Sequence, residues 1–157
     1  MRLLFGQNEY VAGVVGDGLG VMFSGPYVAI GFLDDSGSVR GGAVFNNYNG
    51  SNIEVTVYAP RMATRGLIRA VLHYCFVQLG CNRLTARTRR NNKLAQKSLL
   101  RMGFAFEASL PLYYGPNKND AAILYRMDRK TALKRWLYIT PSLASSDIRN
   151  AGKMEAV

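Results

Sequence analysis

The segment from Arg61 to Gly66 combines basic, small and hydroxyl side chains in a setting that favours anion binding. It follows an apolar run and precedes a helical pattern, so its backbone N–H groups come at the positive start of a helix. Helix starts of this kind bind phosphate groups. Gly66 lets a phosphate approach closely, Thr64 caps the helix or donates its hydroxyl, and Arg65 and Arg69 add positive charge. The expected loop residues are Arg61, Met62, Ala63, Thr64, Arg65 and Gly66.

Glu54 is the main candidate for a general base. In a strand, Glu54, Thr56 and Tyr58 share one face. A carboxylate at this place could take a proton from a reacting group through a water molecule. The alternatives are a solvent-facing strand residue or an ion pair with one of the 20 lysine and arginine residues.

The single histidine and the two cysteines do not indicate a metal site. Cys75 and Cys81 form no Cys-x-x-Cys pair and are too few for a disulfide framework. Arg65, Arg69 and His73 are spaced four apart, which places His73 on the polar face of a helix. We therefore expect no metal and no catalytic role for His73.

Length and composition indicate one domain with a substantial core, because 48% of the 157 residues are apolar. The apolar stretches have the length of strands and fall short of the about 20 residues that cross a membrane. The N-terminal segment is too short for the apolar core of a signal peptide. We expect a cytoplasmic protein with no membrane partner. The net charge of +10 predicts attraction to nucleic acid, acidic proteins or a phosphorylated cofactor.

The first half of the chain predicts an antiparallel meander, because short alternating runs bounded by turn residues are typical of strands. A strand at Arg2–Phe5 comes first, and a short helix at Asn8–Val15 begins near an asparagine cap. Gly16, Gly18 and Gly20 are interpreted as turn residues. The strands of the meander are expected at Tyr27–Leu33, Val39–Tyr48 and Asn52–Ala59.

After Pro60 the apolar spacing becomes helical and continues to Gly80, a typical helix end. A second helix is expected at Asn92–Met102. Its buried stripe would be Ala95, Leu99 and Met102. The strands predicted in this half are Arg83–Thr88, Phe104–Leu112 and Ala121–Met127.

The middle of the chain reads as a strand–helix–strand unit, which should make Ile53–Tyr58 and Arg83–Thr88 parallel neighbours through a right-handed crossover. The predicted fold class is α/β (α+β), with a mixed, mostly antiparallel, twisted sheet of about six to seven strands. This parallel unit lies at its centre and helices flank it. Residues 1–128 would form the one domain, followed over 129–157 by a basic helix around Trp136 and a polar tail.

The segment from Arg61 to Phe104 resembles the acetyl-CoA-binding core of the GNAT superfamily of N-acetyltransferases. The loop of that superfamily reads Gln/Arg-x-x-Gly-x-Gly/Ala, directly after a strand and at the start of a helix. Here Thr64 stands where the first glycine is usual, and Gly66 matches the second. The features that follow reproduce the family order of helix, Gly80, strand, Asn92, Ala95, helix and Gly103-Phe104.

The resemblance implies acetyl-CoA as co-substrate, without a metal, bound between two middle strands that splay apart. In the family, the first of these strands hydrogen-bonds the pantetheine arm and the thioester carbonyl. The matching residues here are Val55, Thr56, Val57 and Tyr58. Asn92 matches the asparagine that binds the pantetheine, and its alternative role is a helix N-cap.

One position departs from the family pattern. Many members carry a tyrosine four residues after the alanine of Asn-x-x-Ala, as general acid for the thiolate, and this chain has Leu99 there. Ser98, one helix step away, and Tyr113 and Tyr114 are the other hydroxyl candidates. Leucine at this place is common in the branch of the family that resembles ribosomal-protein N-terminal acetyltransferases. The chain resembles this branch most. Glu107 resembles a glutamate of that branch and is expected to be structural.

The resemblance implies that the chain transfers the acetyl group of acetyl-CoA to a primary amine by direct attack in a ternary complex. The acceptor would be a protein N-terminus, a lysine or a small amine. This reaction needs no enzyme nucleophile and gains much of its rate from positioning.

The main alternative is a basic module that binds nucleic acid or protein on a degenerate acetyltransferase fold. Thr64 and Leu99 at family positions and the net charge of +10 favour it. Lys93, Lys97 and Arg101 add a basic ridge along one helix face. The lack of an RNA-reading aromatic motif speaks against it. A third alternative is a scaffold that forms a homodimer through the helix around Trp136.

Overall fold

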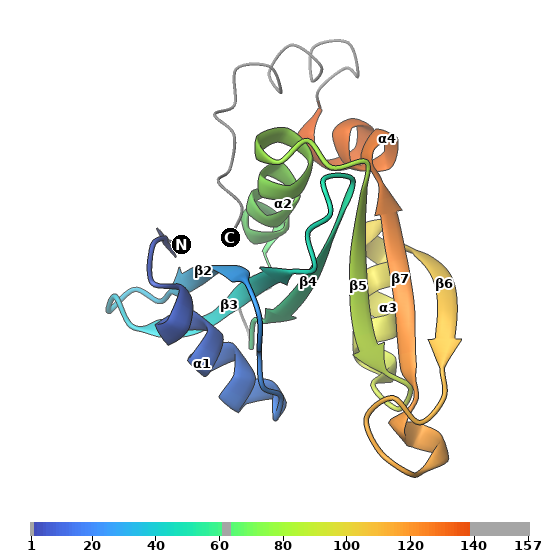
Figure 1. The fold of residues 1–157 in the computed structure, drawn as a ribbon. Coiled ribbons are helices and arrows are strands. Elements are labelled where there is room, and N and C mark those ends of the chain that lie inside the picture. Colours follow the sequence, from blue (N-terminus) through green and yellow to red (C-terminus); the bar gives the residue numbers. More distant parts are fainter. Residues whose placement is uncertain (1, 61–63, 139–157) are drawn as a thin grey trace.

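The computed structural model describes residues 2–60 and 64–138, which form a mixed seven-stranded sheet with helices on both faces (Figure 1). The strand order is β1-β2-β3-β4-β5-β7-β6. The strands are β1 (Arg2–Leu4), β2 (Tyr27–Leu33), β3 (Val39–Asn46), β4 (Asn52–Tyr58), β5 (Arg83–Arg89), β6 (Ala105–Leu110) and β7 (Ala122–Asp128). The helices are α1 (Asn8–Leu19), α2 (Arg65–His73), α3 (Lys93–Met102) and α4 (Arg129–Ala132).

Two of these helices continue into the wider π-helical conformation. A π-helical turn, Tyr74–Gln78, extends α2, and another, Leu133–Leu137, extends α4. A short 3-10 turn, Lys118–Asp120, lies between β6 and β7. No helix in the two described ranges is long and apolar enough to span a membrane.

The centre of the sheet confirms the predicted parallel unit. β4 and β5 pair in parallel from Asn52 with Arg83 to Val55 with Ala86. Within the described ranges, β4 pairs only with β3 beyond Val55, and β5 pairs only with β7 beyond Ala86. The two strands therefore diverge toward their C-terminal ends, as the ribbon shows (Figure 1).

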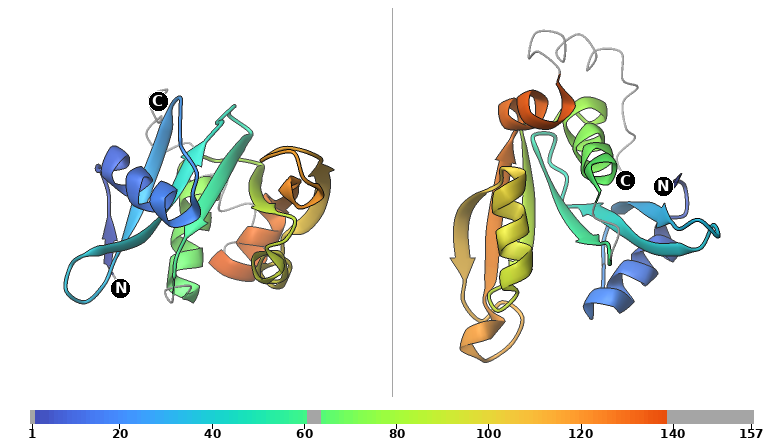
Figure 2. Two further views of the ribbon diagram at one scale, coloured as in Figure 1. Left: turned by 90° about the horizontal axis from the view of Figure 1, so that it is seen from below. Right: turned by 180° about the vertical axis from the view of Figure 1, so that it is seen from behind.

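Two apolar cores lie on opposite faces of the sheet. α1 packs on one face through Val11 and Val15, against Val44 of β3. α2 and α3 lie on the other face (Figure 2), over a larger core that includes Phe45 and Phe76. Side chains as fully buried as these phenylalanines each contribute about 1.5–3 kcal/mol to folding.

The helix that follows β7 belongs to the larger core. Leu133 is fully buried and Trp136 is 6% exposed. The Trp136 indole N–H donates to the carbonyl of Met102 at 2.7 Å, and Arg129 donates to the carbonyl of Phe76 at 2.6 Å. Residues 129–137 therefore fold with the sheet, and the Trp136 ring packs in the larger core of the same chain.

The N-terminal helix differs from the prediction. α1 continues to Leu19, four residues beyond Val15, because Gly16 and Gly18 lie inside it and do not form turns. Gly20, with a φ of 67°, ends the helix in the left-handed conformation that glycine adopts readily. Asn8 does not cap it, since its side-chain oxygen accepts the N–H of Ala29 at 3.0 Å and ties the helix to β2.

The apolar stripe of α3 is only half-buried, which corrects the expectation that it is core. Leu99 and Met102 pack against the larger core but stay partly exposed, and so does Ala95. The reason is that this face of α3 borders the open space between β4 and β5.

Candidate cofactor and acceptor cleft

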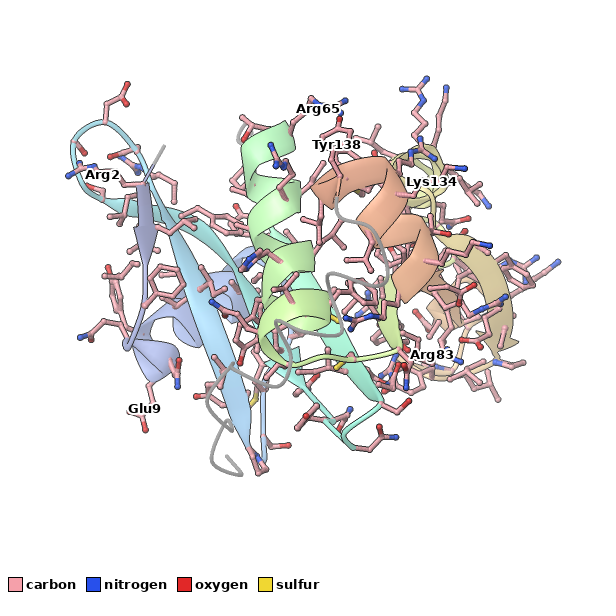
Figure 3. The ribbon with its side chains drawn as sticks, turned by 90° about the horizontal axis from the view of Figure 1, so that it is seen from above. Arg2, Glu9, Arg65, Arg83, Lys134 and Tyr138 are labelled. Carbon is pink, nitrogen blue, oxygen red and sulfur yellow. The ribbon has the colours of Figure 1, made fainter. Side chains whose placement is uncertain are left out.

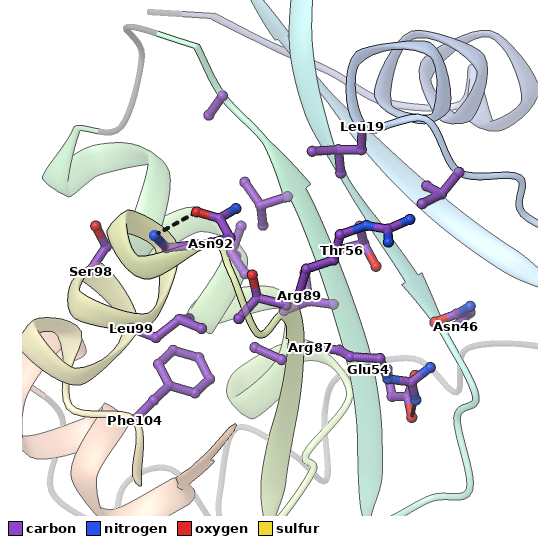
Figure 4. Close-up of a pocket in the computed structure, with 18 of the residues that line it drawn as sticks. Leu19, Asn46, Glu54, Thr56, Arg87, Arg89, Asn92, Ser98, Leu99 and Phe104 are labelled. Atoms are coloured by element: carbon purple, nitrogen blue, oxygen red, sulfur yellow. Dashed lines mark hydrogen bonds and ion pairs between the residues drawn. The ribbon is translucent and has the colours of Figure 1, made fainter. Parts of the chain in front are cut away.

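A cleft of about 850 Å³ lies where β4 and β5 diverge (Figure 4). On one face of the sheet its lining comes from α2 and α3. On the other face it comes from the loop after α1, the end of β3, and Tyr113 and Tyr114. The cleft is thus bordered from both sides of the sheet, and we call these sides the helix face and the open face.

The start of α2 borders the helix face. Thr64 is the N-cap, and its hydroxyl oxygen accepts the N–H of Leu67 at 3.3 Å. The N–H groups of Arg65 and Gly66 are then first-turn amides without intrahelical acceptors. Among the residues that the structure describes, the atom nearest to a Cβ added at Gly66 would be the Thr64 hydroxyl oxygen at 3.9 Å, so these residues leave space beside it. This half of the predicted anion loop therefore fits a phosphate, while Arg61, Met62 and Ala63 lie outside the described residues.

The side chains of Arg65 and Arg69 are engaged with the C-terminal helix. Arg65 donates to the Tyr138 hydroxyl at 3.2 Å and lies 5.0 Å from the Trp136 ring centre. Arg69 lies 5.6 Å from the Tyr138 ring centre. Figure 3 shows Arg65 and Tyr138 next to each other. These guanidinium groups bring positive charge close to the start of α2, and they also fix the helices to each other.

Asn92 is the N-cap of α3, the alternative role considered for it. Its side-chain oxygen accepts the N–H of Ala95 at 3.1 Å (Figure 4). Its side-chain NH₂ has no partner in the part of the chain that the structure describes, and Asn92 also lines the cleft. The cap therefore leaves two donors for a ligand.

Three of the four β4 residues predicted to bind a cofactor line the cleft: Val55, Thr56 and Val57. Val57 is 40% exposed although it is apolar, because no β5 residue pairs with β4 beyond Val55. An extended ligand can pair with such an unpaired strand edge. Tyr58 is placed differently, since its ring packs against Gly18 of α1.

The open face is organised by an ion pair between neighbouring strands. Arg87 contacts one carboxylate oxygen of Glu54 at 2.7 Å, and Asn47 donates to the other oxygen at 3.1 Å. Arg87 also donates to the Tyr113 hydroxyl and lies 4.6 Å from that ring's centre. Glu54 is thus an ion-pair partner, one of the alternatives considered for it, and the Tyr113 hydroxyl accepts a hydrogen bond inside the same cluster.

Ser98 lines the cleft but is exposed, and Figure 4 shows it on the side of α3 away from Leu99 and Phe104. Thr88, which the sequence reasoning missed, is 8% exposed and lines the cleft. It pairs in register with buried Ile123, so it lies on the helix face, and its hydroxyl has no partner within residues 2–60 and 64–138. A polar residue alternating with Leu84 and Ala86 on an apolar strand face was the available signal.

Arg89 and Tyr114, also on the open face, were not predicted as a pair. The Arg89 guanidinium lies 4.3 Å from the Tyr114 ring centre. Burial raises the pKa of Tyr114, so its hydroxyl stays protonated at neutral pH. No group of three metal-ligating side chains occurs among the residues that the structure describes.

No protein-family model and no curated protein sequence matches the chain. Among solved structures, it resembles spermidine/spermine N-acetyltransferase SpeG from Vibrio cholerae in complex with manganese ions, with a TM-score of 0.61 and 19% identity over 69% of each chain. A dodecameric spermidine N-acetyltransferase from Vibrio cholerae gives a TM-score of 0.61 at 18% identity, over 69% of this chain and 68% of that one. The fold is GNAT-like.

A chimera of the Vibrio cholerae SpeG enzyme and hSSAT gives a similar result, with a TM-score of 0.59 and 19% identity over 68% of this chain and 69% of that one. At this level of identity the likeness establishes the GNAT-like architecture alone. It confirms the predicted fold class, and it does not identify a branch or an acceptor.

Proposed function

We propose that the chain is an acetyl-CoA-dependent N-acetyltransferase in which a primary amine attacks the thioester directly. The observation that supports this most is the cleft between the diverging ends of β4 and β5, which has lining residues from both faces of the sheet. Two ligands can then meet inside the sheet, one held from the helix face and one from the open face. The acceptors considered are a protein N-terminus, a lysine and a small amine.

The helix face carries the groups that would hold acetyl-CoA. The free amides of Arg65 and Gly66 suit its pyrophosphate, and the unpaired edge of β4 and the Asn92 NH₂ suit its pantetheine arm. Arg61, Met62 and Ala63 are proposed to complete the phosphate seat. Acetyl-CoA supplies the activated acetyl group as a thioester.

The chain itself contributes positioning and hydrogen bonds. Backbone N–H groups on the free edge of β4 would polarise the carbonyl, a type of contribution that is large in a preorganised site. Thr88, buried and without a partner in the described ranges, would donate its hydroxyl to the leaving sulfur. Tyr113 and Ser98 remain the other hydroxyl candidates for this role. Glu54 would accept a proton only by sharing its carboxylate with Arg87 and Asn47, so positioning of Arg87 is its better supported role.

The experiment that tests this function is acetyl-CoA binding by calorimetry, with Gly66→Glu as the diagnostic variant. We expect micromolar binding by the unchanged chain and no detectable binding by the variant, because a carboxylate would enter the phosphate seat. The matched control is Gly13→Glu, since Gly13 is an exposed helical position with nothing within 4 Å of an added Cβ. Normal binding by Gly66→Glu would refute the loop assignment.

The acceptor branch is a finer question. The leucine at position 99 favours the branch that resembles ribosomal-protein N-terminal acetyltransferases, whereas the similar solved structures named above include spermidine acetyltransferases. A thiol-release screen against peptides, lysine derivatives and polyamines separates these acceptors.

A second candidate is a basic module that binds nucleic acid. No acidic residue occurs between Glu54 and Glu107, and Lys93, Lys97 and Arg101 are exposed along α3. RNA binding that weakens steeply with salt, in a chain that does not bind acetyl-CoA, would favour this module over the enzyme.

A further inference from the structure

Arg89, the last residue of β5, is held in the cleft with its hydrogen-bond donors uncommitted. Its guanidinium lies 4.3 Å from the Tyr114 ring centre, and 41% of its side chain is exposed. Figure 4 shows Arg87 and Arg89 both extending from β5 toward β4. The difference is that Arg87 donates to Glu54 and Tyr113, whereas Arg89 donates no hydrogen bond to any residue that the structure describes.

In the described ranges, one acid forms an ion pair with Arg89, and it holds the guanidinium weakly. Asp120 approaches the Arg89 guanidinium at 3.6 Å, which is longer than a hydrogen bond. The other carboxylate oxygen of Asp120 accepts the N–H of Asn117 at 2.9 Å and so closes the turn before β7. Because exposed ion pairs contribute about 0–1 kcal/mol, an incoming anion can compete with Asp120 for Arg89.

An arginine stacked on an aromatic ring keeps its planar edge free. That edge presents parallel N–H groups in a geometry that matches a carboxylate, and stacking reduces the freedom lost when the carboxylate binds. Tyr114 is itself fixed, since its N–H donates to the carbonyl of Asp120 at 2.8 Å. Arg89 is therefore preorganised for an anion on the open face of the cleft.

The charge of the cleft points to the same ligand class. Among the described residues, those that line it and carry charge are Glu54, Arg87 and Arg89, and both oxygens of Glu54 are already occupied. A polyamine offers hydrogen-bond donors and several positive charges, so in the described part of the lining it would meet two arginines and no free carboxylate. An amine that also carries a carboxylate places opposite charge beside Arg89.

We infer that the acceptor is an amine with a carboxylate close to it, and that Arg89 binds this carboxylate. The inference rests on the proposed acetyltransferase function and names its acceptor class. It makes Arg89 a specificity-determining residue rather than a group that takes part in bond making.

The test compares matched acceptors that differ in one carboxylate. One arm uses free α-amino acids and their amides, and the other uses amidated peptides that begin Ser-Asp or Ser-Asn. Spermidine serves as the polycation. In a thiol-release assay, we expect kcat/KM to be at least about tenfold higher for the carboxylate member of one arm than for its amide partner and for spermidine. A preference for the free amino acids would show that Arg89 binds the terminal carboxylate. A preference for the Ser-Asp peptides would show that it binds a side-chain carboxylate.

Arg89→Gln should abolish this preference through KM, with kcat and acetyl-CoA affinity retained. Arg90→Gln is the matched control, because Arg90 is the next residue and does not line the cleft. Equal rates for both members of each pair, a preference for spermidine, or equal losses for both members in Arg89→Gln would overturn the inference. So would binding of acetyl-CoA with no turnover of any carboxylate-bearing amine.

Calorimetry of the same acceptors without acetyl-CoA distinguishes failure of the proposed acetyltransferase function from failure of the proposed carboxylate site at Arg89. If acetyl-CoA does not bind, the proposed function fails. Carboxylate binding that depends on Arg89 would then still support the site, and its absence would reject the site as well.

Discussion

Arg87 connects two side chains on the open face of the cleft, and this contact determines what Glu54 can do. Its guanidinium contacts the Glu54 carboxylate at 2.7 Å and donates to the Tyr113 hydroxyl. Removal of a general base costs about 10²–10⁴-fold in rate, whereas loss of a positioning contact costs much less. The size of the effect at Glu54 therefore distinguishes the two roles.

For Glu54→Gln we expect turnover to fall about tenfold or less, with acetyl-CoA affinity retained and the shape of the pH–rate profile unchanged. The amide keeps a hydrogen bond to Arg87 but loses the ion pair, which explains a modest effect. Steady-state kinetics from pH 6 to 9 measure this. A larger loss together with a changed pH profile would instead identify Glu54 as the base.

The hydroxyl of Thr88, on the helix face of the cleft, is expected to contribute to turnover. Thr88→Val should lower turnover about tenfold, because the hydroxyl can no longer bind the leaving sulfur. The free energy of unfolding should change by less than about 0.5 kcal/mol, since valine has a similar size and no protein hydrogen bond is lost. Thr88→Ser should keep most of the turnover. If Thr88→Val turned over acetyl-CoA as fast as the unchanged chain, the hydroxyl would have no role.

Sequence reasoning predicted which strand face several residues occupy, but it did not predict which side chains they contact. The alternation correctly placed Glu54 and Tyr58 on one face of β4. The partner of Glu54 depends on the register between β4 and β5, so spacing along the chain could not identify Arg87. In the same way, nothing local predicted that Arg65 turns toward Tyr138, a residue that is distant in sequence.

At the scale of elements, α1 is the helix whose prediction failed most clearly. Glycine is unfavourable inside helices, so Gly16 and Gly18 indicated turns. Tertiary packing decides otherwise, because an added Cβ at Gly18 would lie 2.4 Å from the Tyr58 ring. The glycine lets α1 approach β4, and the loop after α1 then lines the open face of the cleft.

A pair of substitutions in α1 tests this account. Gly18→Ala should destabilise the fold by about 1–3 kcal/mol, because the methyl group would overpack against the Tyr58 ring. Gly13→Ala should stabilise it by about 0.5–1 kcal/mol, because Gly13 faces open space and alanine favours helix. Chemical denaturation measures both. Stabilisation by Gly18→Ala would show that the ring moves aside at little cost.

At the scale of the whole molecule, the predicted mixed sheet with its central parallel pair is what the structure has. The meander and the parallel pair followed from the order of the elements along the chain, whereas the place of β7 between β5 and β6 was not predicted. The packing of Trp136 in the larger core could not be predicted, because a basic sequence around one tryptophan does not show which surface the ring covers. The exposure of Leu99 at the border of an open cleft could not be predicted either, because it also depends on tertiary packing.

The divergence of β4 and β5 has a mechanical consequence. In the described part of the chain, the two halves of the sheet share a ladder only from Asn52 with Arg83 to Val55 with Ala86. α4 and one end of α2 lie across this closed end (Figure 1). Helix packing at the closed end and the ion pair between Arg87 and Glu54 therefore both act on the width of the opening. A small shift of the helices at the closed end would produce a larger change in the distance between the C-terminal ends of β4 and β5.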